Sequence, residues 1–278
     1  MAHHQTVGRG VSEQHQEILI TGANGQIGTL LRHSLRRPDR HLRLLDVHSQ
    51  PEREPGEDVT LIVGSFLDAD TMNHAAEGAS AIIHLGGLST GGFDWHEYLK
   101  VNIDGTREVL EAARRCGVPR VIYASSNHAV GFHRYGSGGP VPDYLYPRPD
   151  SLYGVSKAAS ESLCSLYHDR YGLDTVSLRI GSFRERPIDA RMLWSWLSPG
   201  DCARLFEAAL GVVSPGFRVV WGVSANTRAV VSLEAAHEIG YFPLDDAEIY
   251  AHELLVNRDE SAPAIDLVGG PYAEPDFE

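Results

Sequence analysis

Two side chains in the middle of the chain, Tyr153 and Lys157, have the types and the spacing needed to move a proton. They lie four residues apart within Ser151–Tyr171, a segment whose pattern predicts a helix, so both project from one helix face. A free tyrosine has a pKa of about 10 and is a poor base at neutral pH. A neighbouring ammonium favours the phenolate and thereby lowers the pKa of the phenol. The pair is therefore a candidate acid–base couple.

A second chemical signal lies near the N-terminus, where the apolar run Ile18–Thr21 leads into three glycines. Each glycine stands three residues after the one before, and a helical pattern over Gln26–Arg37 overlaps the last of them. Glycines are needed where the chain turns tightly and a phosphate approaches bare backbone N–H groups at a helix N-terminus. The spacing and the position predict a dinucleotide-binding turn made of Gly22, Gly25, Gln26, Ile27 and Gly28.

An acidic side chain closes the second apolar segment, Leu42–Asp46. In a dinucleotide-binding fold, a carboxylate at this position accepts hydrogen bonds from the hydroxyls of the adenosine ribose, whereas its charge would repel a 2′-phosphate. No arginine directly follows Asp46 to reverse that preference. We therefore predict that the cofactor is NAD rather than NADP. The alternative is that Asp46 is only a solvated acid at a strand end.

The elements that must position these residues alternate regularly from Glu17 onward. Apolar segments predict strands at Ile18–Thr21, Leu42–Asp46, Thr60–Val63, Ala81–Leu85, Arg120–Ala124, Thr175–Ile180 and Arg218–Val220. Between them, helical patterns cover Gln26–Arg37, Ala69–Ala76, Tyr98–Arg115 and Ser151–Tyr171. Short apolar strands joined by helical crossovers predict an α/β fold with a doubly wound parallel sheet of the Rossmann type.

The same pattern predicts the domain organisation. We expect a mobile tail over residues 1–16, which are polar and aperiodic, and a single NAD-binding domain over residues 17–278. The segment Gly131–Pro149 is rich in glycine and proline and is expected to form a loop over the site. The pattern loosens after Arg184, so residues 184–278 should supply most of a small C-terminal substrate-binding cap. Helices are expected there at Pro199–Val213, Ser232–Ile239 and Ala247–Leu255.

Composition argues against several classes of function. The chain has 37 acidic and 24 basic residues and a formal net charge of −13, and a nucleic-acid partner would need a basic surface. No apolar run is long enough for a membrane span, and no signal region precedes the first strand. The cysteines are three and scattered, and no spacing of histidine or cysteine fits a metal site. We expect a cytoplasmic protein without metal, membrane or nucleic acid as partners.

Several strings along the chain resemble the extended short-chain dehydrogenase/reductase family, which is similar to NAD-dependent epimerases and dehydratases. Within that family the sequence is most similar to those of uronate dehydrogenases. The matching strings, in chain order, are Thr21-Gly-x-x-Gly-x-x-Gly28, His84-Leu-Gly-Gly87, Ala124-Ser-Ser-Asn-His128, Leu152-Tyr-Gly-Val-Ser-Lys157, Arg179-Ile-Gly-Ser182, Arg191-Met-Leu193 and Trp221-Gly-Val-Ser-Ala-Asn226. The tyrosine–lysine motif marks only the broad family, and the Ser-Asn-His and Arg-Met-Leu strings narrow it.

The resemblance implies NAD-dependent oxidation of the C1 hydroxyl of a free uronic acid, such as glucuronate or galacturonate, to an aldarolactone. Tyr153 would be the general base, Lys157 would also hold the nicotinamide ribose, and Ser126 at the end of a strand would orient the reacting oxygen. Arg191 would bind the carboxylate of the sugar, a role for which Arg179, Arg184 and Arg186 compete. A homo-oligomer is also implied. Further substrate contacts would come from Ser89, Asn127, His128 and Ser182, and further cofactor contacts from Leu85, Gly86 and Ser65, where the family commonly has an acid.

Two other functions remain open from the residues alone. Sugar-nucleotide epimerases and dehydratases share the glycines and the tyrosine–lysine pair, but they need a larger C-terminal region to hold a nucleotide diphosphate. A non-catalytic NAD-binding sensor would share the glycine turn, but such proteins typically lack the pair Tyr153 and Lys157. Turnover of a nucleotide sugar would favour the first alternative, and NAD binding without turnover would favour the second.

Overall fold

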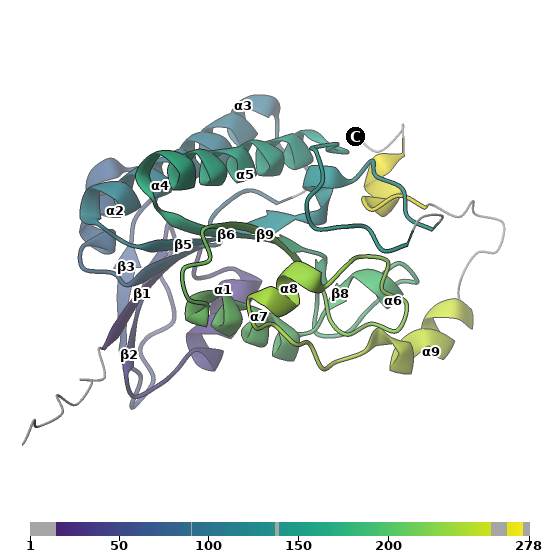
Figure 1. Ribbon diagram of the computed structural model, residues 1–278. Coiled ribbons are helices and arrows are strands. Elements are labelled where there is room, and N and C mark those ends of the chain that lie inside the picture. The colour runs from purple at the N-terminus through teal and green to yellow at the C-terminus, as the bar shows by residue number, and fades with distance from the viewer. Residues whose placement is uncertain (1–14, 90, 137–138, 257–265, 275–278) are drawn as a thin grey trace, which may run out of the picture.

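The computed structural model describes residues 15–89, 91–136, 139–256 and 266–274. In it, parallel strands form a seven-stranded sheet in the order β3-β2-β1-β4-β5-β6-β9 (Figure 1). These strands are β1 (Gln16–Thr21), β2 (Arg40–Asp46), β3 (Val59–Val63), β4 (Ala81–His84), β5 (Arg120–Ser126), β6 (Asp174–Ile180) and β9 (Phe217–Gly222). Each coincides with a strand that the sequence predicts, within two residues at either end. The predicted doubly wound parallel sheet is confirmed.

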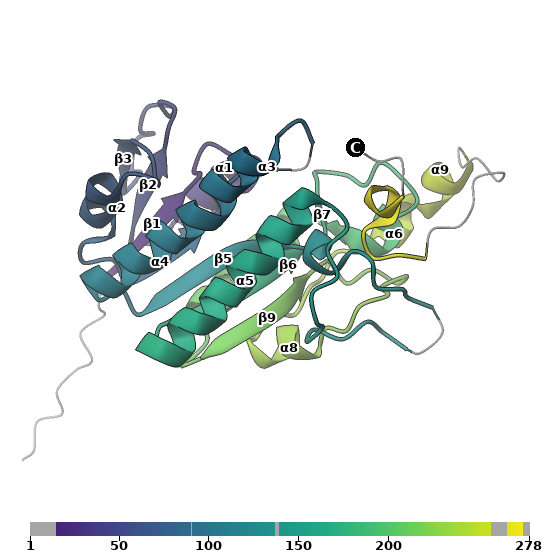
Figure 2. The same ribbon diagram turned by 90° about the horizontal axis from the view of Figure 1, so that it is seen from above.

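Helices cover both faces of the sheet (Figure 1, Figure 2). One face carries α2 (Ala69–Ala76), α4 (Gly105–Cys116) and α5 (Leu152–Tyr171). The other face carries α1 (Gln26–Ser34), α7 (Pro199–Gly211) and α8 (Glu234–Glu238). A parallel sheet covered in this way is buried on both sides, which explains why its strands read as short apolar runs.

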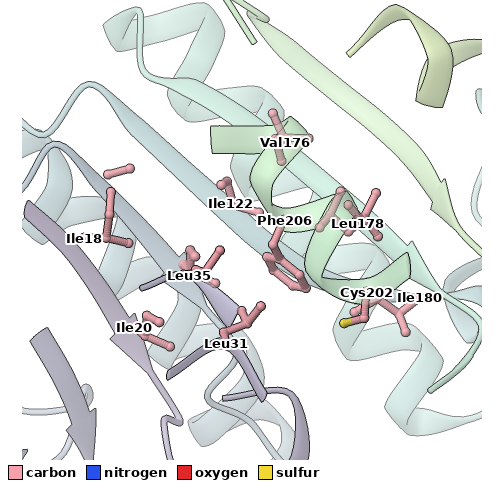
Figure 3. Packing of buried hydrophobic residues seen from close by; sticks show 14 of the residues in the cluster. Ile18, Ile20, Leu31, Leu35, Ile122, Val176, Leu178, Ile180, Cys202 and Phe206 are labelled. Carbon is pink, nitrogen blue, oxygen red and sulfur yellow. The ribbon is translucent and has the colours of Figure 1, made fainter. Parts of the chain in front are cut away.

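Side chains along β1 alternate between the two helix layers, as the pleat of a strand requires. Ile18 and Ile20 pack in the cluster that contains Leu31 of α1 and Phe206 of α7, as Figure 3 shows. Leu19, between them, packs in the opposite cluster with side chains of α2, α4 and α5. All of these residues are essentially inaccessible to solvent. This packing fixes the strand register and with it the place where β1 ends.

Two predicted helices differ from the observed ones by more than two residues at one end. Helix α1 ends at Ser34, short of the predicted Arg37, because the residue before Pro38 is disfavoured in helical conformation. The single helix predicted over Tyr98–Arg115 consists of three joined pieces, which are α3 (Trp95–Tyr98), the π-helical turn η1 (Leu99–Asp104) and α4. Periodicity alone does not separate an inserted π turn from a regular helix.

Short elements that the sequence did not predict follow β6. Strands β7 (Ser182–Phe183) and β8 (Trp196–Leu197) form a small parallel pair, and α6 (Met192–Ser195) lies between them in the chain. The helix predicted over Ala247–Leu255 is present as the 3₁₀ turn η3 (Ala247–Tyr250) followed by α9 (Ala251–Val256). The 3₁₀ turn η4 (Gly270–Ala273), which was not predicted, lies further along the chain. Within the range expected to be mainly the cap, α7 and β9 instead pack into the sheet core.

The expected loop over residues 131–149 contains no helix or strand in its described part. Residues 1–14, which make up nearly all of the expected mobile tail, lie outside the described residues, so that prediction stays a prediction. No helix among the described residues is both long enough and apolar enough to cross a membrane.

Candidate functional site

The carboxyl ends of β1, β4, β5 and β6 surround a cavity of about 570 Å³. The chain runs from β1 to β2 and β3 on one side, and β4 then lies on the other side of β1, so the strand order reverses at the cavity. Ligands of doubly wound folds bind at this kind of switch point. The predicted residues that line the cavity are Gly22, Gly25, Gln26, Ile27 and Gly28 from the first turn, Leu85 and Ser89 after β4, Ser126 from β5, and Tyr153 and Lys157 from α5.

The glycine turn after β1 has backbone geometry that only glycine accommodates. Gly22 has a φ of +70°, and a Cβ there would lie 2.6 Å from the backbone nitrogen of Gly86. At Gly28 a Cβ would lie 2.5 Å from the carbonyl oxygen of Ala23. Gly25 caps α1 and provides no side-chain oxygen, so no side chain occupies the N–H groups of the first helical turn. These donors are therefore available to an anion, as pyrophosphate binding requires.

Asp46 at the end of β2 braces the glycine turn. Its Oδ2 accepts a hydrogen bond from the backbone N–H of Asn24 at 2.9 Å, and its Oδ1 accepts one from the N–H of His48 at 3.1 Å. A carboxylate has about four acceptor positions, so two remain for ribose hydroxyls. The side chain is 11% exposed. Asp46 is therefore not a freely solvated acid, as the alternative interpretation required. Ribose binding by Asp46 stays a prediction.

Two further predicted cofactor residues are held by local hydrogen bonds. The hydroxyl oxygen of Ser65 accepts from the backbone N–H of Leu67 at 3.1 Å, which leaves the hydroxyl proton available for donation. The N–H of Leu85 donates to the carbonyl of Thr21 at 3.1 Å and so ties the end of β4 to the end of β1. Gly86 follows, and a Cβ there would lie 2.5 Å from the ring of Phe66. Gly86 is not among the residues that line the cavity, whereas the next residue, Gly87, is.

Helix α5 brings the predicted acid–base pair to the cavity. The side chain of Ser151 caps the helix by accepting from the N–H of Gly154 at 3.0 Å. The ammonium of Lys157 donates to the carbonyl of Ala124 at 2.8 Å and lies 5.5 Å from the ring centroid of Tyr153. Residues on one face of a helix are therefore directed at the end of β5, as the four-residue spacing predicts.

Burial dominates the acid–base properties of this pair. It raises the pKa of Tyr153 to about 12, against the lowering effect of a hydrogen bond with Ser126. It lowers the pKa of Lys157 to about 8, against the raising effect of Glu161. The sequence predicts that Lys157 lowers the pKa of the phenol, but the cost of burying a phenolate sets the direction of the shift in the chain, and the lowering contribution comes from Ser126. A positive charge brought by a bound cofactor would act in the opposite direction and favour the phenolate.

A second group of predicted residues contacts the C-terminal segment 266–274, which is yellow in Figure 2. The side-chain amide of Asn127 donates to the carbonyl of Val268 at 3.1 Å, and Nη2 of Arg191 donates to the same oxygen at 2.8 Å. Nη1 of Arg191 donates to the hydroxyl of Ser182 at 3.3 Å. We call Asn127, His128, Ser182, Arg191 and segment 266–274 the substrate wall. The carbonyl of Val268 joins Asn127 to Arg191, and Ser182 is joined to them through the guanidinium.

Arg191 has unused hydrogen-bonding capacity. Its guanidinium has five N–H groups, of which the bonds to Ser182 and Val268 use two. Its Nε is enclosed and has no hydrogen-bond partner among the described residues. Burial lowers the pKa of Arg191 from its ordinary value, which shows that the protein solvates the charge less well than water does. Of its competitors, Arg179 is bound to Glu161 and Arg186 to Glu253.

The structure adds site residues that the sequence analysis missed. Tyr272 of η4 lies edge-on to the ring of His128, with centroids 4.5 Å apart, and Asp150 lies 2.7 Å from the same imidazole. Asp150 directly precedes the helix cap Ser151, which was a usable signal. Tyr272 had none, because only folding brings the C-terminal segment to this place. Arg184, which the sequence predicts only as a competitor for the sugar carboxylate, also lines the cavity.

One group of metal-ligand types occurs among the described residues, away from the cavity. It consists of His33, Glu54 and Glu57. Both carboxylates are within 2.7 Å of Arg36, and Glu57 also accepts from Arg32, so positive side chains already neutralise them. The expectation of no metal stays an expectation.

Comparisons with known proteins agree with this geometry. The model of the NAD dependent epimerase/dehydratase family matches residues 18–184. Uronate dehydrogenase of Pseudomonas putida is 40% identical over 259 residues, 92% of this chain and 95% of that protein. The same enzyme of Pseudomonas syringae pv. tomato is 40% identical over 233 residues, covering 84% and 83%. A crystal structure of uronate dehydrogenase from Agrobacterium tumefaciens superposes with a TM-score of 0.84 at 33% identity and covers 94% of this chain and 98% of that one.

The fold and the cavity at the strand switch point define a Rossmann-type dinucleotide-binding protein. The chain belongs to the NAD dependent epimerase/dehydratase family and is an NAD-dependent dehydrogenase.

Proposed function

We propose that this enzyme oxidises the C1 hydroxyl of a free uronic acid, such as glucuronate or galacturonate, to an aldarolactone. The observation that carries the proposal is the largely buried guanidinium of Arg191 on the substrate wall. In a chain with a net charge of −13, an anionic sugar needs such a fixed cation. The similarity to uronate dehydrogenases over most of the chain supports the same substrate class.

The residues around the first turn fit NAD. The cradle at Gly22 and Gly28 has no room for a Cβ, the first turn of α1 offers N–H donors, and Asp46 retains acceptor positions. Leu85, Gly86 and Ser65 would complete this site. NAD, when bound, supplies the acceptor for the hydride that leaves C1. The carboxylate of Asp46 disfavours a 2′-phosphate and thus NADP.

Tyr153 would take the proton of the C1 hydroxyl as the carbon is oxidised, so that the electron pair of the C–H bond leaves as hydride and the C1–O bond becomes a carbonyl. Ser126, which hydrogen-bonds with the phenol, would orient the same oxygen. Lys157 would hold the nicotinamide ribose and stabilise the phenolate. Removing hydride from C1 of a ring hemiacetal gives a lactone, so the product keeps the ring.

Arg191 would bind the sugar carboxylate through the N–H groups that Ser182 and Val268 leave free. A guanidinium matches a carboxylate with two parallel hydrogen bonds, and a bound carboxylate would satisfy the enclosed Nε. Ser89, Asn127, His128 and Ser182 would contact the sugar hydroxyls. Ser89 lines the cavity, and its carbonyl accepts from the hydroxyl of Tyr98 at 3.0 Å, which fixes the segment after β4.

We also propose that the enzyme is cytoplasmic and forms a homo-oligomer. The arguments are the odd, scattered cysteines and the resemblance to uronate dehydrogenases. Cell fractionation tests the first statement, and analytical ultracentrifugation of the purified chain tests the second.

The decisive experiment measures NADH formation at saturating NAD across free uronic acids, neutral aldoses and nucleotide sugars. We expect turnover of free uronic acids with kcat/KM at least tenfold above the neutral aldoses, and a lactone as the first product by NMR. Turnover of nucleotide sugars alone would replace this function with that of an epimerase or dehydratase. NAD binding without any turnover would indicate a sensor.

A further inference from the structure

Asp150 is a buried carboxylate next to the substrate wall that the proposed chemistry leaves without a role. Its side chain has no exposed surface, and its Oδ2 lies 2.7 Å from Nδ1 of His128. Its Oδ1 accepts from the hydroxyl of Ser151 at 2.9 Å. We propose that Asp150 is a positioning residue that holds the imidazole of His128 with the proton on Nδ1, so that Nε2 accepts a hydrogen bond from a hydroxyl of the bound sugar.

The carboxylate of Asp150 sits between two glycines that make room for it. A Cβ on Gly131 would lie 1.8 Å from Oδ2 of Asp150, and a Cβ on Gly269 would lie 1.9 Å from the same atom. The N–H of Gly269 donates to the carbonyl of Gly131 at 2.9 Å, which joins the loop after β5 to the C-terminal segment. Only a pair of residues without side chains allows both backbones to close around the carboxylate. The position of Oδ2 beside His128 is thereby fixed.

The donors available to Asp150 determine where the imidazole proton lies. A buried carboxylate is costly unless hydrogen-bond donors satisfy it. The described residues offer its side chain two, the hydroxyl of Ser151 and the ring of His128. A neutral imidazole has one N–H and one bare nitrogen. With Nδ1 bare, two acceptors would face each other at 2.7 Å, so the N–H is on Nδ1 and Nε2 is the acceptor.

The remaining ring nitrogen is directed away from Asp150 and stays reachable. Nε2 of His128 has no hydrogen-bond partner among the described residues, and it is not one of the fully enclosed polar atoms that lack a partner. The ring packs edge-on against Tyr272 and lies 5.8 Å, centroid to centroid, from Tyr153. These two rings limit its rotation. An acceptor is thus held beside the phenol that, under the proposed function, takes the proton from C1.

The first test reads the tautomer directly and needs no substrate. Nitrogen NMR of the full chain labelled in histidine, with His128→Gln to identify the resonance, should show the Nδ1–H form of His128 in the wild type. In Asp150→Asn the amide can donate to Nδ1, and the Nε2–H form should increase. An Nε2–H form in the wild type would overturn the proposal. Because no turnover is involved, this outcome is independent of whether uronic acids are the substrates.

The second test asks whether Asp150 acts through His128. Asp150→Asn should lower kcat/KM for a uronic acid by about 10- to 100-fold, the range found when a metal-bound histidine loses its carboxylate partner, with an unchanged Kd for NAD. In a His128→Gln background the same change should cost less than twofold. The charge of Asp150 also raises the pKa of Tyr153, so its removal shifts the pH dependence of kcat/KM. The variants are therefore compared at pH values where kcat/KM no longer changes with pH. Equal losses in both backgrounds would refute a role through His128.

Asp201→Asn is the matched control. Asp201 is also fully buried and accepts from the backbone N–H groups of Leu244 and Asp245, but it lies at the start of α7 on the opposite side of the sheet. Its loss should lower the free energy of unfolding and leave both kcat/KM and the His128 tautomer unchanged. If Asp150→Asn does not fold, the wild-type tautomer still decides the proposal.

Discussion

The two sides of the cavity are built in different ways. The glycine turn and the start of α1 line one side of the cavity, and the hydrogen bonds that brace them link residues 22–24 to residues 45–46 at the end of β2. The substrate wall combines Asn127 and Arg191 with Val268, which lies 141 residues from the first and 77 from the second. One side depends on local geometry and the other on long-range contacts.

This difference between the glycine turn and the substrate wall explains how each side of the cavity selects its ligand. A pyrophosphate is common to many ligands, and unoccupied N–H groups at a helix start are enough to bind it. A particular sugar must be recognised by side chains, and these need a rigid arrangement of several segments. The substrate wall also contains a polar atom that has no partner among the described residues, Nε of Arg191, whereas Asp46 on the cofactor side accepts two hydrogen bonds. Changes on the two sides should therefore have separable effects.

The largest effect is expected from Tyr153→Phe. Loss of the general base should lower kcat by about 10²- to 10⁴-fold, while the Kd for NAD stays within about threefold because the ring still packs on α5. Steady-state NADH formation and NAD titration by fluorescence measure the two quantities. Retained turnover would remove Tyr153 from the mechanism, and a parallel loss of NAD binding would mean that the two sides are not separable.

Arg191→Gln should act on the substrate side alone. Losing the charged hydrogen bonds to the sugar carboxylate costs about 1.5 to 3 kcal/mol, which lowers kcat/KM for a uronic acid by about 10- to 150-fold. A neutral aldose should lose much less, and the Kd for NAD should not change. Arg186→Gln is the control, because Arg186 is exposed and paired with Glu253. Similar losses for both sugars would indicate that Arg191 only supports the fold.

Asp46→Asn should act on the cofactor side alone. The amide oxygen can still accept from one backbone N–H, but the negative charge near the ribose is gone. The preference for NAD over NADP should fall by about tenfold, equivalent to about 1.4 kcal/mol. The ratio of kcat/KM values for the two cofactors measures it, with KM for the uronic acid as the internal control. An unchanged ratio of the two kcat/KM values would show that Asp46 only stabilises the glycine turn and does not bind the ribose.

The smallest effect on activity is expected far from the cavity, at Glu57. Arg32 holds the pKa of this buried carboxyl at about 2, below its ordinary 4.5. Because the folded pKa is depressed, the stabilisation is complete above pH 4.5 and is lost as the pH falls from about 4.5 to about 2. Glu57→Gln should lower the free energy of unfolding at pH 7 by about 1.5 to 3 kcal/mol. Urea titrations at pH 7 and pH 3 should show this difference shrinking, with kcat unchanged; an equal difference at both pH values would contradict the assignment.

Sequence patterns were sufficient where structure follows from neighbours in the chain. The strands, the glycine turn and the face that carries Tyr153 and Lys157 depend on apolar periodicity, on the missing Cβ and on helical spacing, all of which can be read locally. The π turn at Leu99–Asp104 and the small β7–β8 pair could not be predicted, because they arise from packing against other elements. Nor could the pairing of Asp150 with His128.

The amino-acid order by itself determined the doubly wound sheet, the cofactor turn and the reactive helix, since each is encoded by the period of its own side chains. Tertiary structure alone decided how deeply the phenol of Tyr153 is buried, and so the direction in which its pKa moves in the chain. It also decided that residues 266–274 close the substrate wall. Burial and long-range contacts are sums over the whole fold, and no local pattern contains them.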